Sequence, residues 1–221
     1  MYTTRSMNKF RLGLIASYLF SFLVLAFLVK NSNTLISTFD SKIQNVFVPF
    51  TTPTTTKIVH FISNLGSPAV SFIFSLFALT FTYIMYSKKE AIWALIVLIS
   101  GELLVHIIKN LMARPRPSDK LVSATGFSFP SGHTFGTALL VLIAIYLLVP
   151  HLHNKTLRIS LIIGGLVWIG IIGLTRIYLH DHYPTDVLAS LLLVGTIWEI
   201  ARIYQPQVSN LTHKHFAHFK Y

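Results

Sequence analysis

Residues 132–149 read GHTFGTALLVLIAIYLLV, a run that contains no lysine, arginine, aspartate or glutamate. A transmembrane helix needs about 20 consecutive, mostly apolar residues to cross the hydrocarbon core of a bilayer. Five further apolar segments lie roughly at residues 12–29, 69–86, 91–108, 159–174 and 186–203. We therefore predict an all-α membrane protein whose six spans form one helix bundle, with both termini on the same side.

The composition favours a single membrane-embedded domain over residues 1–221. Hydrophobic residues make up 53% of the chain and charged residues only 11%, which is more apolar surface than one soluble core of this size could bury. The net charge of +11 could suggest a nucleic-acid partner, but the cations sit at span ends and not on a basic polar domain, so we expect none. The first segment lacks a signal-peptide cleavage site and is expected to be retained. The chain has no cysteine and therefore no disulfide.

The distribution of lysine and arginine predicts how the bundle is oriented. Ten of the 18 fall on the side of the two termini and eight on the other side. Because positive residues favour the cytoplasmic side, we expect cytoplasmic termini in a multi-pass cell-membrane protein. The three motifs described below would then face the extracytoplasmic side.

The segment between the first two spans, residues 31–66, is too polar to cross the membrane. Its apolar residues recur at helical spacing: Leu35, Ile36, Phe39, Ile43, Val46 and Phe47. We expect a short amphipathic helix in the outer interface, with an ordinary connecting loop as the alternative. At the other end of the chain, residues 205–221 are expected to form a polar tail, in which metal binding by His213, His215 and His218 is the less favoured alternative.

Three charged motifs fall at the outer ends of predicted spans, where charge is costly unless it has a function. They are Lys109 with Arg116-Pro117, Pro130-Ser131-Gly132-His133, and Arg176 followed by His182 and Asp186. Lysine and arginine neutralise phosphate oxygens, and the guanidinium group can bind them in pairs. A serine N-cap and a glycine at a helix N-terminus direct further donors at an anion. We predict a phosphate site formed by Lys109, Arg116, Ser131, Gly132 and Arg176.

Two histidines supply the groups that phosphoryl transfer needs. His182 lies four residues before Asp186, so that on a helical turn the carboxylate could accept the ring N–H and raise the basicity of the other nitrogen. His182 is therefore the better nucleophile. His133 has no carboxylate nearby in the sequence and suits protonation of the leaving group.

These three motifs, Lys109-x6-Arg116-Pro117, Pro130-Ser131-Gly132-His133 and Thr175-Arg176-x5-His182-x3-Asp186, resemble the signature motifs of the type 2 phosphatidic acid phosphatase superfamily in order and spacing. The resemblance implies a metal-independent membrane phosphatase with no cofactor, an outward-facing site and a membrane lipid as substrate. It also implies that His182 becomes phosphorylated, that His133 is the acid and that Asp186 supports the nucleophile. The remaining motif residues would hold the phosphate. Thr175 stands where the family usually has serine and keeps a hydroxyl group.

The sequence leaves more than one substrate and more than one class of function open. Small size and short loops resemble bacterial members that act on phosphatidylglycerol phosphate or undecaprenyl pyrophosphate, and phosphatidate and diacylglycerol pyrophosphate also stay open. A non-catalytic lipid-binding, lipid-transfer or scrambling protein could use the same cations but would not need both histidines. Vanadate-dependent halide oxidation, which related soluble enzymes perform with a similar site, is disfavoured by the membrane setting.

Several ionisable residues lie outside the proposed phosphate and catalytic roles. Glu102, His106 and Lys109 share one helix face, so we expect Glu102 to neutralise a buried histidine or lysine, with shaping of the site as the alternative. His60 is expected to be interfacial. Arg114 would contact either a substrate head group or the phosphates of bulk lipids. A metal site formed by His180, Asp181, His182 and Asp186 is disfavoured, because adjacent side chains on a helix diverge.

Overall fold

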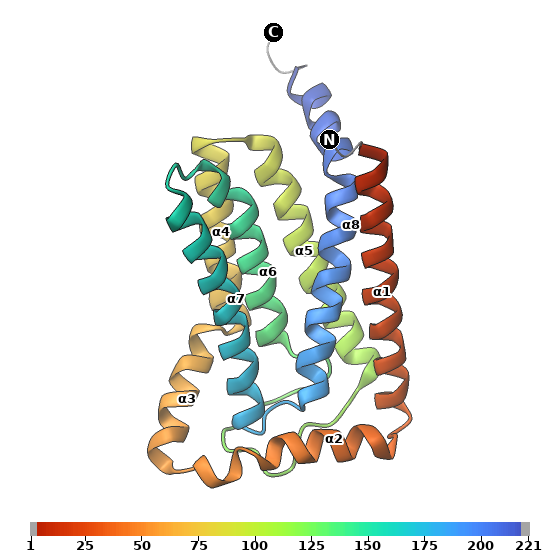
Figure 1. Ribbon diagram of the computed structural model, residues 1–221, viewed down its shortest axis with the longest axis vertical. Coiled ribbons are helices and arrows are strands. Elements are labelled where there is room, and N and C mark those ends of the chain that lie inside the picture. Colours follow the sequence, from red (N-terminus) through yellow and green to blue (C-terminus); the bar gives the residue numbers. More distant parts are fainter. Residues whose placement is uncertain (1–3, 218–221) are drawn as a thin grey trace.

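The computed structural model describes the backbone of residues 4–217 and the side chains of residues 7–205. Within that part the chain is helical and has no strand. Its α-helices are α1 (Thr4–Lys30), α2 (Thr34–Asn45), α3 (Pro53–Leu65), α4 (Pro68–Met85), α5 (Lys88–Met112), α6 (Gly132–Leu147), α7 (Lys155–Tyr178) and α8 (Pro184–Ala217), with 3₁₀ turns at Val48–Phe50 and Val149–His151. Figure 1 shows α1 and α4–α8 running lengthwise beside one another, while α2 lies across one end of the bundle.

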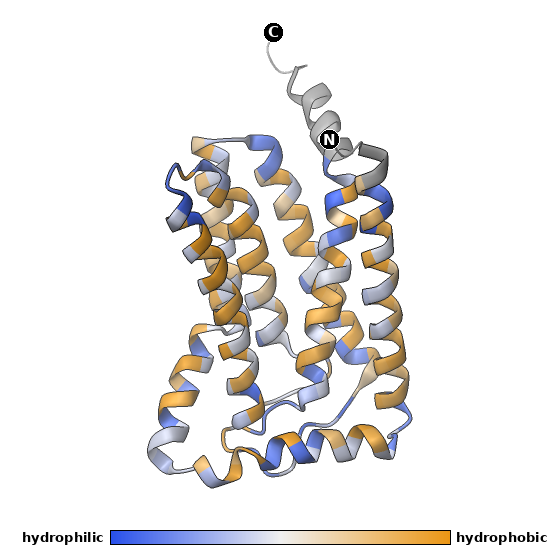
Figure 2. Cartoon of the chain, in the orientation of Figure 1, coloured by the Kyte–Doolittle hydropathy of each residue, from blue (hydrophilic) through white to orange (hydrophobic). Residues whose placement is uncertain are grey.

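Among the described residues, six helical segments are long and apolar enough to cross a membrane, and the second of them joins α3 and α4. They begin and end at Met7–Lys30, Pro53–Met85, Lys88–Met112, Gly132–His151, Lys155–Tyr178 and Pro184–Gln205. Figure 2 shows apolar residues along the lengthwise helices and polar residues gathered toward their ends. Large apolar side chains such as Phe20, Phe27 and Phe77 are exposed on the outside of the bundle, where lipid would contact them. The prediction of an all-α protein with six spans is confirmed.

Helix α6 forms the centre of the bundle and packs against α4, α5, α7 and α8. Phe135, Leu139, Ile143 and Leu147 recur every fourth residue along it, and all four are fully buried. A methyl group on Gly101 of α5 would lie 3.2 Å from both Leu139 and Phe135, so the missing side chain lets α5 approach α6 closely. This close packing fixes the start of α6 relative to the end of α5.

The segment between the first two predicted spans, residues 31–66, contains more helix than we predicted. The expected amphipathic helix is α2, so the alternative of an ordinary loop is wrong. A second helix, α3, follows it and was missed. Thr52 caps α3 because its side chain accepts a hydrogen bond from the Thr55 backbone N–H, and the Thr52 backbone N–H donates in turn to the Thr55 hydroxyl group. Pro53 occupies the first turn. The threonine- and proline-rich residues 51–56 therefore contain the start of a helix.

Helix α8 extends beyond the predicted sixth span. The expected polar tail at residues 205–221 begins inside this helix, whose backbone continues to Ala217. The side chains of His213, His215 and His218 lie outside the described residues.

Candidate active site

Four helix ends meet at the end of the bundle that α2 crosses (Figure 1). Lys109 lies in the last turn of α5, Arg176 in the last turn of α7 and Asp186 in the first turn of α8. Ser131 caps the start of α6, where its Oγ accepts a hydrogen bond from the Thr134 backbone N–H at 3.4 Å. The three motifs, far apart in the sequence, thus share one region of the structure.

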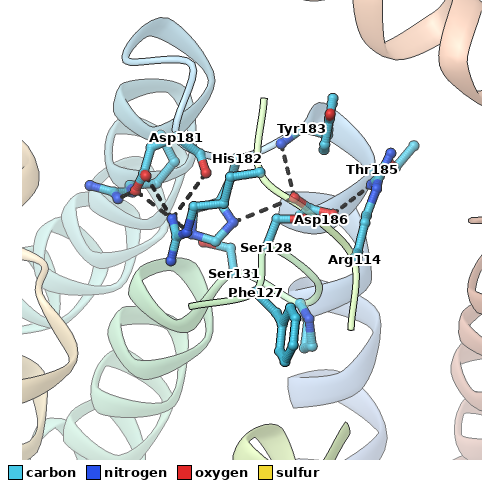
Figure 3. Close-up of polar contacts among 12 residues, drawn as sticks. Arg114, Phe127, Ser128, Ser131, Asp181, His182, Tyr183, Thr185 and Asp186 are labelled. Atoms are coloured by element: carbon cyan, nitrogen blue, oxygen red, sulfur yellow. Dashed lines mark hydrogen bonds and ion pairs between the residues drawn. The ribbon is translucent and has the colours of Figure 1, made fainter. Parts of the chain in front are cut away.

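His182 lies in the turn between α7 and α8, and its side chain is buried. Its Nδ1 is 3.4 Å from Oδ2 of Asp186, and its Nε2 is 3.3 Å from Nη1 of Arg116 (Figure 3). A guanidinium group can only donate hydrogen bonds, so Nε2 must be the acceptor and Nδ1 carries the ring proton. The lone pair of Nε2 therefore faces the cations of the site.

The surroundings of His182 keep its ring neutral. Burial, followed by the positive charges of Arg176, Lys109 and Arg116, lowers the pKa of His182 well below its ordinary value of 6.5. At neutral pH the ring is uncharged, and the lone pair of Nε2 carries no proton. This is the state that a nitrogen nucleophile requires.

Asp186 is held on both carboxylate oxygens by contacts within the protein. Its Oδ2 accepts a hydrogen bond from the Tyr183 backbone N–H at 2.9 Å, and its Oδ1 lies 2.6 Å from Nη1 of Arg114. Arg114 also contacts Oδ2 of Asp40 on α2 at 2.7 Å, and Asp40 in turn accepts a hydrogen bond from the Thr185 backbone N–H at 3.0 Å. Helix α2 is thereby connected to the carboxylate that faces His182.

These contacts decide the role of Arg114, which the sequence left open. Its guanidinium contacts two buried protein carboxylates, and it also lies 3.9 Å above the ring of Tyr183. Asp40 was missed altogether. The available signal was its position on the apolar face of α2, between Ile36 and Ile43 at helical spacing.

The three predicted cations are each engaged with the protein. Lys109 donates from Nζ to the carbonyl oxygens of Phe127 at 2.9 Å and Pro130 at 2.8 Å, so it holds the segment that leads into α6. Arg116 Nη1 lies 2.6 Å from Oδ1 of Asp181, and Arg176 forms an ion pair with the other oxygen of that carboxylate. Arg176 also donates to Oγ of Ser63 on α3, at 2.5 Å. Sequence reasoning missed Ser63 and considered Asp181 only as part of a disfavoured metal site.

His133 lies in the first turn of α6 and is partly exposed. The charges of Arg176, Arg116 and Lys109 and the ring of His182 all lie close enough to act on it electrostatically. Its position in the first turn brings it, with Ser131 and Gly132, to the region where the cations gather. All eight predicted site residues are therefore placed at one end of the bundle.

The expected pairing of Glu102 does not occur. Among the described residues Glu102 forms no ion pair, and its buried Oε1 has no hydrogen-bond partner. Lys109 is bound instead to backbone carbonyls, and His106 contacts the Asn110 side chain at 3.1 Å. Because Glu102 points toward Gly136 in the bundle interior, it lies apart from both expected partners.

His180 faces away from the cations. Its Nδ1 lies 2.5 Å from Oδ2 of Asp119, whereas the neighbouring Asp181 points to the arginines. The side chains of His180 and Asp181 therefore point in different directions. In the part of the chain with described side chains, no three His, Asp or Glu residues are grouped so that they could hold a metal ion.

Comparisons with known proteins agree with this geometry. The PAP2 superfamily model matches residues 90–210. Phosphatidylglycerophosphatase B of Bacillus subtilis (strain 168) is 28% identical over 205 residues, which cover 90% of this chain and 98% of that protein. Undecaprenyl-diphosphatase BcrC of the same organism is 30% identical over 149 residues, which cover 58% of this chain and 72% of that protein.

Two solved structures share the fold. The crystal structure of a transmembrane PAP2 type phosphatidylglycerolphosphate phosphatase from Bacillus subtilis matches with a TM-score of 0.79 at 24% identity, covering 87% of this chain and 96% of that one. The structure of Aquifex aeolicus LpxE matches with a TM-score of 0.53 at 22% identity, covering 72% and 91% of the two chains.

Proposed function

The chain belongs to the PAP2 superfamily, and we propose that this membrane-embedded lipid phosphatase removes the terminal phosphate of phosphatidylglycerophosphate, of undecaprenyl pyrophosphate, or of both. The first substrate is supported by a relative named phosphatidylglycerophosphatase B whose length is matched almost completely. The second is supported by a relative named undecaprenyl-diphosphatase, matched over a shorter part of this chain.

The observation that carries this proposal is the placement of the His182 ring between Asp186 and Arg116. A purely lipid-binding or scrambling protein needs the cations but has no use for a buried, neutral imidazole that lies between a carboxylate and a guanidinium group. Here Nδ1 faces Asp186 at 3.4 Å and Nε2 faces Arg116 at 3.3 Å. The lone pair therefore points toward the group that would bind a phosphate oxygen.

The proposed reaction has two steps. The Nε2 lone pair of His182 attacks the phosphorus, the bond from phosphorus to the lipid oxygen breaks, and that oxygen takes a proton from His133. Asp186 accepts a hydrogen bond from Nδ1–H and stabilises the positive charge of the phosphorylated ring. Water then attacks the phosphorus while His133 accepts a proton from it, the phosphorus–nitrogen bond breaks, and inorganic phosphate leaves.

Protein side chains supply the charge neutralisation in this scheme. The equatorial oxygens of a transferring phosphoryl group develop charge that donors and cations must stabilise. Lys109 lies in the last turn of α5, Arg176 in the last turn of α7 and Arg116 in the segment that follows α5, and all three converge on this region. We infer that no metal ion is needed for turnover.

Phosphate release from a substrate panel tests the proposed function. Detergent-purified protein would be offered phosphatidylglycerophosphate, undecaprenyl pyrophosphate, phosphatidate and diacylglycerol pyrophosphate, each with and without EDTA. We expect release from at least one of the first two lipids at the same rate in both conditions. Loss of activity in EDTA, restored by a divalent cation, would contradict the metal-free mechanism. Absence of release from all four lipids would favour the lipid-binding alternative.

We also propose that the site faces the extracytoplasmic side of the cell membrane and that both termini are cytoplasmic. The described ends of α1 and α8 lie at the end of the bundle opposite α2 (Figure 1). In the sequence, ten of the 18 lysines and arginines belong to the terminal segments and to the connections assigned to that side. Because the chain has no cysteine, single cysteines can report on each side. In intact cells a membrane-impermeant maleimide should label Ser41→Cys on α2, and it should label Thr156→Cys only after permeabilisation. The reverse pattern would invert the topology.

A further inference from the structure

A buried carboxylate occupies the space between the phosphate-binding arginines. Asp181 is fully buried, and its two oxygens face two different guanidinium groups, that of Arg116 at 2.6 Å and that of Arg176. Its Oδ2 is also 3.9 Å from Nε2 of His182. Asp181 thus contacts the same three groups that the proposed reaction assigns to the incoming phosphate.

The backbone fixes Asp181 in this position. In the turn that follows α7, His180 has the left-handed conformation, with φ 51°. The backbone N–H of the next residue, Asp181, donates a hydrogen bond to the Arg176 carbonyl oxygen at 3.2 Å. Arg116 also donates from Nη1 to the Asp181 carbonyl oxygen at 3.0 Å. The contact is therefore part of the turn that carries His182 and does not depend on a mobile side chain.

We propose that Asp181 acts as an internal competitor for the phosphate, a role that rests on the proposed function of this site. A phosphate that binds Arg116 and Arg176 must displace the carboxylate or lie beside it, and either arrangement costs binding free energy because like charges repel. Asp181 thereby weakens the binding of every phosphate species that uses the two arginines, including the inorganic phosphate product. It is a positioning and affinity-setting residue and not a group that reacts.

The charge balance of the site explains why such a residue is useful. Lys109, Arg116 and Arg176 carry three positive charges, and Asp181 reduces their sum to two. A phosphate monoester carries about two negative charges near neutral pH. The carboxylate therefore moderates the attraction of these cations for an anion, and tight binding that is equal for substrate and product gives no gain in turnover.

The test measures binding of inorganic phosphate and orthovanadate to the detergent-purified full-length protein by isothermal titration calorimetry. Asp181→Asn keeps the size of the side chain and removes its charge. We expect it to bind both anions at least about tenfold more tightly than the wild type, and to lower KM for the lipid substrate without raising kcat. Unchanged or weaker anion binding in Asp181→Asn would overturn the proposal, because a merely structural carboxylate predicts lower kcat with no gain in affinity.

Two control variants separate the possible failures. Asp119→Asn removes a nearby carboxylate whose ion-pair partner among the described residues is His180, and 65% of the Asp119 side chain is exposed. This variant should bind phosphate like the wild type. Arg176→Ala should lose phosphate binding. If Arg176→Ala bound phosphate normally, the assignment of the phosphate site itself would fail, whatever Asp181→Asn does. Thermal unfolding shows whether each variant is folded, and Asp181→Ser replaces Asp181→Asn if the latter does not fold.

Discussion

His182→Ala is expected to abolish lipid phosphate release, with a fall in kcat of about 10⁵-fold or more, as for other variants that lose a covalent nucleophile. The variant removes the atom that would bond to phosphorus, while the surrounding cations remain. Phosphate release from the preferred lipid of the panel, measured with purified wild-type and variant protein, checks this result. Wild-type rates in the variant would refute the nucleophile assignment.

The same substitution at a distant histidine provides the control. His153 is exposed at the opposite end of the bundle, and His153→Ala should leave the rate unchanged.

Asp186→Asn should lower the rate of phosphate release less than His182→Ala does. The amide still occupies the position beside Nδ1 but no longer stabilises a positive ring. Binding of phosphate should persist in His182→Ala, so a loss of binding together with activity would indicate a collapsed site and not a missing nucleophile.

His133→Ala is expected to slow lipid hydrolysis by about 10²–10⁴-fold, the usual contribution of a general acid. The effect should depend on the leaving group. A glycerol alkoxide needs a proton as it departs, whereas the phosphomonoester released from a pyrophosphate is a far weaker base. The variant should therefore lose more activity on phosphatidylglycerophosphate than on undecaprenyl pyrophosphate, as measured by kcat on each lipid.

An aryl phosphate with an acidic phenol makes this test sharper. Its leaving group needs no acid, so His133→Ala should form the phosphoenzyme at close to the wild-type rate. Because His133 also assists the attack of water, phosphohistidine should accumulate and be detectable after an alkaline quench. Equal losses on all leaving groups, with no accumulated intermediate, would show that His133 does not transfer the proton.

The fold was predictable because the bilayer imposes simple requirements. Runs such as residues 132–149 are long enough and apolar enough to span, and in lipid such a segment can satisfy its backbone only as a helix. The start of α6 was also predictable, since Ser131 is an N-cap residue followed by glycine. Helix α3 was missed because only one short helix was predicted in residues 31–66, although Thr52-Pro53 is a helix-start signal.

The sequence by itself determined the class of the protein and the residue types of its site. Motif order and spacing predicted Lys109, Arg116, His133, His182 and Asp186 as site residues, since the proposed chemistry needs such groups in or near the ends of spans. It did not reveal Asp40, Ser63 or the role of Arg114, because their partners lie on other helices. Only the tertiary structure decided that Asp40 of α2 reaches Asp186 through Arg114, and that Asp181 faces the arginines while adjacent His180 faces away. Such contacts depend on how helix ends are juxtaposed and on the left-handed turn after α7, and no local pattern in the chain encodes the distance between two buried charges.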